Sequence, residues 1–206
     1  MKEQAKHRII VGISGASGVI YGIRLLQILR DLGLETHLVM TKAAEMTIGY
    51  ETDSNSKSVA ALATRAYALA DVGAAIASGS FKTMGMIVMP CSIRTMSEIA
   101  TGVTSNLLTR AADVVLKEKR RLVLSVRETP LHLGHLRRMT ELAEMGAIIA
   151  PPVPAFYAAP RSIEELIDQS VGRVLDLFHL DAPATKRWGE DLSGGRRGQG
   201  KGQRES

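Results

Sequence analysis

Residues 8–18 read RIIVGISGASG, a short apolar run that passes directly into a turn rich in glycine and serine. The amphipathic stretch from Val19 to Leu32 follows, so the segment predicts a strand, a glycine-rich turn and a helix. Glycine lets a backbone approach an anion closely, and a helix start is expected to offer unpaired N–H groups. We interpret the turn as a phosphate site, with a simple connecting turn as the alternative.

The kind of phosphate ligand follows from what the turn lacks. It departs from the G-x-G-x-x-G pattern, and no acidic residue follows the second predicted strand to hold a ribose. Ser14 and Ser17 instead place hydroxyls at the turn, and a hydroxyl can donate a hydrogen bond to phosphate. These features favour flavin mononucleotide (FMN) over NAD.

Apolar runs alternate with helical patterns along the rest of the chain. The predicted strands after the first are Leu34–Met40, Met84–Met89, Leu122–Val126 and Ala147–Ala150. The predicted helices after the first are Ala43–Tyr50, the Ala-rich Val59–Ala77, Met96–Gly102, Asn106–Lys119, Leu133–Met145 and Ser162–Phe178. This alternation predicts an α/β fold with a mainly parallel sheet, helices on both faces, and ligands beyond the carboxyl ends of the strands.

Length and charge suggest one domain followed by a tail. The 206 residues are 45% hydrophobic, and we expect a single domain over 1–188 with a disordered Gly/Arg-rich tail over 189–206. Residues 186–206 hold six basic and three acidic side chains and thus +3 of the net +5, so the body carries little excess charge. With aromatics at 4% as well, no nucleic-acid partner is expected.

Cysteine and hydropathy bear on location. The chain has one cysteine, Cys91, which fits a reducing compartment. No apolar run approaches the roughly 18 residues of a membrane span, and the start is polar. We expect a cytoplasmic protein with no membrane partner.

Polar residues follow several predicted strands at the carboxyl edge. The segment Pro90–Thr95 offers hydroxyls and the Arg94 guanidinium at a helix start, a set suited to an anion. Cys91 in this segment is expected to pack rather than act as a nucleophile, because no histidine or acid lies nearby in sequence. Arg127 and Glu128 follow a buried strand, where they form either an internal salt bridge or a phosphate ligand beside a general acid.

Other candidates remain ambiguous from the residues alone. Lys117 is either a second cation for that pocket or a solvated helix end. The role of Glu51 is ambiguous in the same way. Tyr157 and Arg173 could converge on one phosphate oxygen. His132 and His135 share a helical face, but a zinc site needs a third ligand that the pattern does not supply, so no metal is expected.

Together these segments resemble the UbiX-like flavin prenyltransferases, including the B subunits associated with hydroxyarylic acid decarboxylases. The resemblance covers about Arg8 to Trp188. The matching stretches are residues 12–18, 41–44, 51–52, 78–81, 90–95, 110–118, 127–130, 154–157 and 187–188.

The resemblance implies a flavodoxin-like (Rossmann-like) three-layer sandwich and a homo-oligomer, commonly a dodecamer, with active sites at subunit interfaces. It implies metal-independent prenylation of reduced FMN by dimethylallyl phosphate, with a ring built on N5 and C6. The product, prenylated FMN, would serve a UbiD-like decarboxylase. Phosphate rather than pyrophosphate is the expected leaving group, because no Asp-rich magnesium motif is present.

The family's functional residues carry over by matching motifs. The residues expected to bind FMN are Gly15, Ala16, Ser17, Thr41, Ser92, Ile93, Arg94, Thr95 and Arg127. Those expected to hold or protonate the prenyl phosphate are Lys117, Arg127, Glu128, Tyr157 and Arg173. Glu51 is expected near the reacting flavin edge, with Glu128, Glu51 and Lys117 as the catalytic set. Residues 78–80 and Trp188 are expected to help close the pocket.

Some positions depart from the family pattern. Thr41 replaces a usual Ser and keeps its hydroxyl, whereas Arg138 and His132 replace a usual Asn and Ser. Two alternative functions remain: an FMN-dependent cysteine decarboxylase, and a non-catalytic FMN-binding subunit of an aromatic acid decarboxylase. The Asn-rich segment of the former is not evident, and the latter has no use for a second phosphate site.

Overall fold

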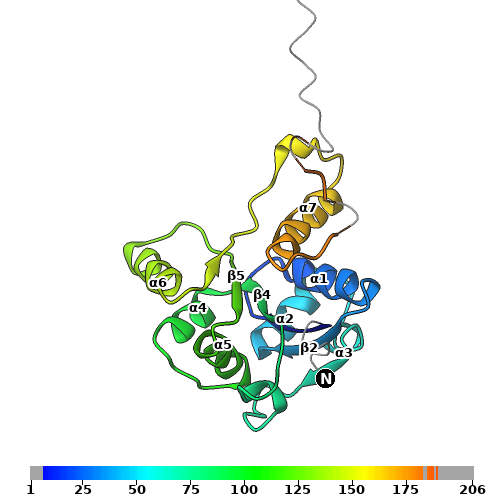
Figure 1. The fold of residues 1–206 in the computed structure, drawn as a ribbon. Coiled ribbons are helices and arrows are strands. Elements are labelled where there is room, and N and C mark those ends of the chain that lie inside the picture. The colour runs from blue at the N-terminus through cyan, green and yellow to red at the C-terminus, as the bar shows by residue number, and fades with distance from the viewer. Residues whose placement is uncertain (1–6, 183–184, 188, 190–206) are drawn as a thin grey trace, which may run out of the picture.

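One sheet of six parallel strands organises the chain, in the order β3-β2-β1-β4-β5-β6 (Figure 1). The computed structural model describes residues 7–182, 185–187 and 189. The strands are β1 Arg8–Ile13, β2 Glu35–Met40, β3 Arg65–Tyr67, β4 Gly85–Cys91, β5 Arg121–Val126 and β6 Ile148–Ile149. The helices are α1 Val19–Asp31, α2 Lys42–Glu51, α3 Ser56–Ala60, α4 Ile93–Ala100, α5 Leu107–Lys117, α6 Leu133–Glu144 and α7 Ile163–Asp176, with short 3₁₀ turns at Ala75–Ala77 (η2) and Phe156–Ala158 (η3).

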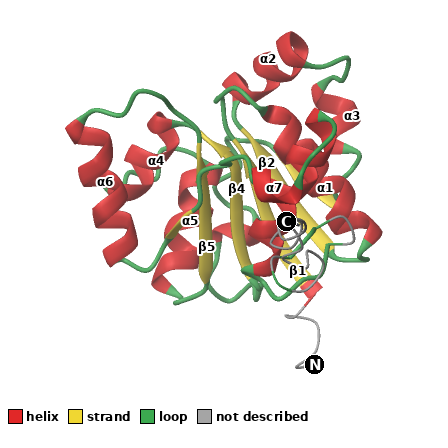
Figure 2. Ribbon diagram, turned by 90° about the horizontal axis from the view of Figure 1, so that it is seen from above, coloured by secondary structure: helices red, strands yellow, loops and turns green. Residues whose placement is uncertain are grey.

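Helices cover both faces of this sheet, which makes the predicted three layers (Figure 2). Ile9, Val11 and Ile13 of β1 pack into a core with α1 and α7, whereas Ile10 faces a second core with α4 and α5. Both side-chain sets of the central strands are therefore buried. This explains why the strands read as continuous apolar runs rather than as alternating patterns.

The strand order accounts for the two fold names that the resemblance suggested. With the three-residue edge strand β3 included, the order is that of the Rossmann fold. Without β3, the remaining five strands have the flavodoxin order. In both, the direction of strand addition reverses between β1 and β4, and this reversal marks the expected ligand position.

One predicted element is wrong: Val59–Ala77 is not a helix. The segment holds the end of α3, the strand β3 and the turn η2. Its alanines favour helix as an intrinsic propensity, but Arg65, Ala66 and Tyr67 pair with β2 at the sheet edge. A pairing partner distant in sequence thus overrides the local preference. The other helices and strands lie where they were predicted, with ends shifted by a few residues; α4 begins at Ile93 after a Ser92 cap.

The ends of the chain bear on two further expectations. The predicted tail, residues 189–206, lies outside the described residues apart from Gly189, and so does Trp188. Among the helices of the described part, none has the length and apolar character needed to cross a membrane.

Two helical glycines predict opposite effects of the same substitution. A Cβ added to Gly22 in α1 would lie 2.3 Å from the backbone oxygen of Met89 in β4, whereas a Cβ at Gly49 in α2 meets nothing within 4 Å. We expect Gly22→Ala to lower the free energy of unfolding by about 1–3 kcal/mol, because α1 must move off the sheet. Gly49→Ala, the matched control, should raise it by about 0.5–1 kcal/mol.

Urea unfolding of the two variants and the parent protein measures both effects. Equal stability of the two variants would contradict the close approach of α1 to β4 at Gly22.

Candidate active site

The loops that follow β1 and β4 are joined by a buried serine at the point where strand addition reverses. Ser14, which is fully buried, donates its hydroxyl to the Pro90 carbonyl at 3.0 Å. The same oxygen accepts the Ser92 amide at 2.7 Å. Both bonding roles of the Ser14 hydroxyl are therefore used within the fold. Of the two serines expected to offer hydroxyls to phosphate, Ser14 is thus committed to the fold, and Ser17 donates to the Glu51 carboxylate.

A cavity of about 500 Å³ opens beside this junction, at the carboxyl ends of β1, β4 and β5. Its volume is in the usual range for small-molecule sites. The residues that line it are Gly15, Ala16, Ser17, Ser92, Ile93, Arg127, Glu128 and Thr129. The structure thus brings together six of the nine residues expected to bind FMN, and it adds Thr129, which the motif comparison had placed beside them without a role.

The start of α4 forms one wall of the cavity. Ser92 caps the helix, accepting the Thr95 amide at 3.3 Å and donating to the Thr95 hydroxyl at 3.2 Å. Thr95 is buried and therefore orients Ser92 rather than lining the cavity. The Arg94 side chain is 86% exposed and pairs with Glu98 at 2.9 Å. The guanidinium of Arg94 is thus not brought to the cavity of its own chain.

Glu51 corrects the expectation that the first amides of α1 are unpaired. One carboxylate oxygen of Glu51 accepts the Gly18 amide at 2.7 Å and the Val19 amide at 3.1 Å. The positive end of the α1 dipole is therefore matched by a carboxylate of the protein itself. Burial opposes ionisation of Glu51, but hydrogen bonds from Ser17 and these amides, with Arg127 nearby, outweigh it and hold its pKa below the usual value.

Thr41 lies at the other end of α2, beyond the carboxyl end of β2. Its hydroxyl accepts the Ala44 amide at 3.1 Å and so caps the helix. Its own amide donates to the Ile13 carbonyl at 3.0 Å. Thr41 is near the turn after β1 but is not among the residues that line the cavity.

Arg127 and Glu128 form no salt bridge with each other or with any other described residue, which removes that alternative. The Arg127 amide donates to the Cys91 carbonyl at 3.0 Å, and its side chain lies against Gly18. Glu128 is exposed and accepts the Thr129 amide at 2.9 Å. Within the part of the chain that the structure describes, both charged groups are therefore free of ion pairs at the cavity.

Lys117 lies at the opposite end of the strands from the cavity, where β5 begins. It ends α5 before β5 begins, whereas Arg127 and Glu128 follow the end of that strand. Six strand residues at about 3.3 Å each separate the two edges by roughly 20 Å. At its own edge the Lys117 ammonium pairs with Glu118 at 2.5 Å and lies beside Gly79 of the 78–80 segment. A single chain therefore cannot bring Lys117 and Glu128 to one phosphate.

Tyr157 and Arg173 belong to a third region, formed by η3 and α7. The segment between β6 and α7 extends away from the sheet in Figure 1, drawn in yellow. The Tyr157 hydroxyl accepts a hydrogen bond from Gln169 at 3.3 Å. Arg173 pairs with Asp176 at 2.6 Å, and the second oxygen of Asp176 accepts from Arg187 at 2.8 Å. Sequence reasoning did not single out Gln169 or Asp176, because their partners are fixed only by the packing around α7.

The remaining candidates have structural roles. Cys91 is buried in β4, and burial raises the pKa of its thiol, so it is not an activated nucleophile. His132 caps α6 by accepting the Gly134 amide at 3.0 Å, and its ring lies 3.5 Å from that of His135. Among the described residues, no group of three or more His, Cys, Asp or Glu side chains could hold a metal ion.

Comparison with known proteins places this arrangement among flavoproteins. The model of the Flavoprotein family matches residues 1–175. Flavin prenyltransferase UbiX of Escherichia coli K12 is 60% identical over 177 residues, which cover 85% of this chain and 94% of that protein.

Two solved structures superpose closely. The structure of AnUbiX (PadA1) in complex with FMN and dimethylallyl pyrophosphate has a TM-score of 0.87 at 54% identity, covering 88% of this chain and 97% of that one. A dodecameric FMN-dependent UbiX-like decarboxylase from Escherichia coli O157:H7 also has a TM-score of 0.87, at 49% identity, with 88% and 98% covered. The FMN-dependent cysteine decarboxylase TvaF, at 18% identity and a TM-score of 0.57, shares the fold alone; 70% of this chain and 90% of that chain are covered.

The contact between Glu51 and α1 predicts a pH-dependent contribution to stability. A carboxyl with a lowered pKa stabilises the fold above its unfolded value, near 4.5, and this contribution is lost as the pH falls through the folded value. We expect Glu51→Gln to cost about 1 kcal/mol at neutral pH, as for loss of a helix cap. The melting temperatures of the two proteins should converge well below pH 4.5.

Thermal unfolding followed by circular dichroism across this pH range tests the effect. A gap in melting temperature that stays constant with pH would show that the charge on Glu51 does not stabilise α1.

Proposed function

We infer, because this chain belongs to the UbiX-like flavin prenyltransferases of the flavoprotein family, that it joins the dimethylallyl group of dimethylallyl phosphate to N5 and C6 of reduced FMN. It is thus a prenyltransferase that binds FMN. The observation that carries this function is the cavity at the β1–β4 junction, where Ser17, Ser92 and Arg127 meet Glu128. The Arg127 guanidinium, which forms no ion pair within the described residues, suits the phosphate of FMN, and Glu128 supplies an acid beside it.

The residues of this cavity divide between the two substrates. We propose that Gly15, Ala16, Ser17, Ser92 and Ile93 bind FMN through small side chains and the first amides of α4, which have no partner within the helix. The other three residues expected to bind FMN lie beside the cavity rather than in its lining, and we assign them a supporting role: Thr41, Arg94 and Thr95. Glu51, held at the start of α1 next to Ser17, lies where a carboxylate can face the reacting edge of the flavin.

The chemical step requires positive charge around the leaving phosphate. The bond between C1 of the dimethylallyl group and the phosphate oxygen breaks, and the oxygen keeps the electron pair. Lys117, Arg127 and Arg173 stabilise that oxygen, Tyr157 donates a hydrogen bond, and Glu128 supplies a proton. C1 of the dimethylallyl group would bond to N5 of reduced FMN, and the N5 hydrogen would leave as a proton. The bond to C6 requires a proton to add at C2 of the prenyl double bond, so that C3 bonds to C6 and the C6 hydrogen leaves as a proton.

The side chains assigned to the leaving phosphate reach one phosphate only if several copies of the chain meet. Lys117, Arg127 and Tyr157 lie in three separate regions of one chain. The segment that carries Tyr157 also exposes apolar side chains, with Val153 at 73% and Phe156 at 75%, which suits burial against another copy. We propose a homo-oligomer, commonly a dodecamer in this family, in which each site draws residues from more than one copy.

Two finer points are also part of the proposal. The related solved structure contains dimethylallyl pyrophosphate, whereas we propose the monophosphate as the preferred donor for this chain. We further propose that the prenylated FMN passes to a UbiD-like decarboxylase. Activity with both donors, compared as kcat/KM, addresses the first point.

The direct test is anaerobic incubation with reduced FMN and dimethylallyl phosphate, followed by mass spectrometry of the released flavin. We expect a flavin heavier by one five-carbon unit. Glu128→Gln should bind FMN normally and slow prenylation by about 100-fold or more, because general acids typically contribute that much.

Equal rates for the Glu128→Gln variant and the parent protein would remove Glu128 from the mechanism. Unmodified FMN from a parent protein that binds it would favour an accessory flavin carrier or a cysteine decarboxylase instead.

Mixing two inactive variants tests whether sites are shared between copies. Co-expressed Lys117→Ala and Arg127→Ala chains should regain about a quarter of the parent rate, if each site draws the two residues from different copies at random. The matched control mixes Arg127→Ala with Glu128→Gln, which alter one cavity of one chain and should show no recovery. Recovery in neither mixture would contradict the sharing of one site between copies.

A further inference from the structure

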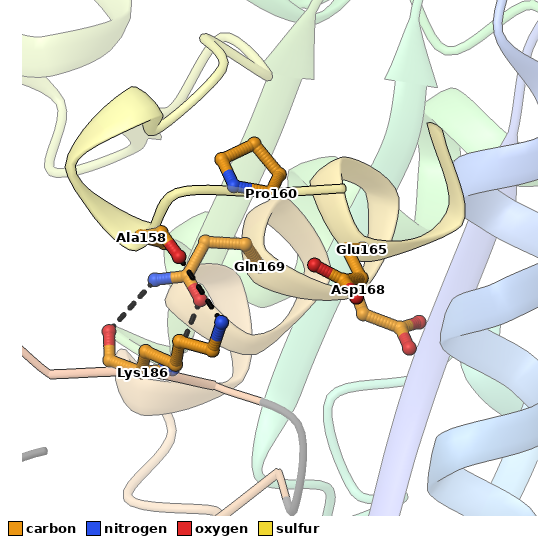
Figure 3. Close-up of a pocket in the computed structure, with 6 residues that line it drawn as sticks. All are labelled: Ala158, Pro160, Glu165, Asp168, Gln169 and Lys186. Atoms are coloured by element: carbon orange, nitrogen blue, oxygen red, sulfur yellow. Dashed lines mark hydrogen bonds between the residues drawn. The ribbon is translucent and has the colours of Figure 1, made fainter. Parts of the chain in front are cut away.

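A short strap of the chain, Thr185–Arg187, lies along α7 next to the segment that carries Tyr157. Gln169 of α7, only 2% exposed, binds the strap through both of its amide atoms. Its oxygen accepts the Lys186 amide at 2.9 Å, and its nitrogen donates to the Lys186 carbonyl at 2.9 Å (Figure 3). The strap is therefore paired to a side chain much as one strand pairs with another.

The strap sits against α7 because the helix has a glycine at the contact. A Cβ added to Gly172 would lie 1.6 Å from the hydroxyl oxygen of Thr185, so any larger residue would push the strap away. Lys186 then extends its ammonium to the Ala158 carbonyl at 3.1 Å, next to Tyr157 (Figure 3). The strap thus fixes the backbone beside Tyr157 as well as the Gln169 amide.

The two strap bonds settle which way the Gln169 amide points. The Lys186 N–H needs an acceptor and its carbonyl needs a donor, so the amide oxygen and nitrogen cannot be exchanged. The second N–H of that nitrogen faces the Tyr157 hydroxyl at 3.3 Å. In this contact the phenol oxygen must accept, and its own hydrogen points away from Gln169.

We propose that Gln169 is a positioning residue that keeps the Tyr157 hydroxyl oriented as a hydrogen-bond donor toward the prenyl phosphate. This inference rests on the proposed function, in which Tyr157 holds that phosphate. Gln169 itself touches no substrate. Its contribution is the direction of one hydrogen bond, which the buried strap maintains.

A double-mutant cycle with Tyr157→Phe tests the proposal. Gln169→Met keeps the length of the side chain, adds no charge and removes the donor to Tyr157. We expect it to raise the KM for dimethylallyl phosphate about tenfold, with a smaller change in kcat and FMN affinity unchanged. In the Tyr157→Phe background the same change should add less than about twofold, because the hydroxyl it orients is already absent.

Gln169→Glu provides a second variant that keeps the bond from the Lys186 amide if the Met variant unfolds. Its carboxylate would accept from Tyr157 and so reverse the direction of that hydrogen bond, which should also raise KM only when the phenol is present. Equal increases in both backgrounds would overturn the proposal, because they would show that Gln169 only holds the strap in place. Unchanged KM in Tyr157→Phe, with normal prenylation by the parent protein, would overturn it while leaving the proposed function intact. Absence of prenylation by the parent protein would overturn both.

Discussion

The hydroxyl of Ser14 is the constraint on which the site depends. It joins the ends of β1 and β4, two neighbouring parallel strands from which the chain continues toward opposite sides of the sheet, to β2 and to β5. Beyond the last paired residues the Ser14 amide also donates to the Pro90 carbonyl at 3.2 Å, and the hydroxyl extends this link to the Ser92 amide of the loop after β4. A buried hydroxyl that both donates and accepts leaves no unsatisfied polar group at the junction. The cavity exists because these two loops are held side by side with the loop after β5.

Much of the fold follows from the sequence, because buried parallel strands read as apolar runs and the helices carry clear caps. The exception, 59–77, shows where this reasoning fails. Arg65–Tyr67 form a strand only because β2 offers an unpaired edge, and an edge partner leaves no periodic signal in three residues. The Ser14 hydroxyl was predicted to bind the ligand phosphate rather than to join two strands of the fold, for a similar reason. A serine in a glycine-rich turn looks the same whether its hydroxyl faces phosphate or a carbonyl of a neighbouring strand.

The site was predictable as a set of residues but not as an arrangement. Motif order grouped Lys117 with Glu128, although an entire strand separates them in one chain. The amides at the start of α1 were expected to be open, and Glu51, which lies 33 positions along the chain from Gly18, occupies them. Gln169 was not predicted at all, because its importance arises from a three-residue strap that reaches it from 17 positions further along the chain. Contacts across such distances are set by packing, and local spacing does not encode them.

The burial of Cys91 has a consequence for an enzyme that handles reduced flavin. Reduced flavin exposed to air yields hydrogen peroxide, and peroxide attacks thiolates far more readily than thiols. The single sulfhydryl of this chain stands next to Ser92, one residue from the cavity wall, yet it is fully enclosed in the sheet and held in its protonated form. The protein therefore presents no oxidisable sulfur from cysteine at the place where peroxide would be generated. Exposure to oxygen should consume the flavin substrate and leave the polypeptide's own thiol intact.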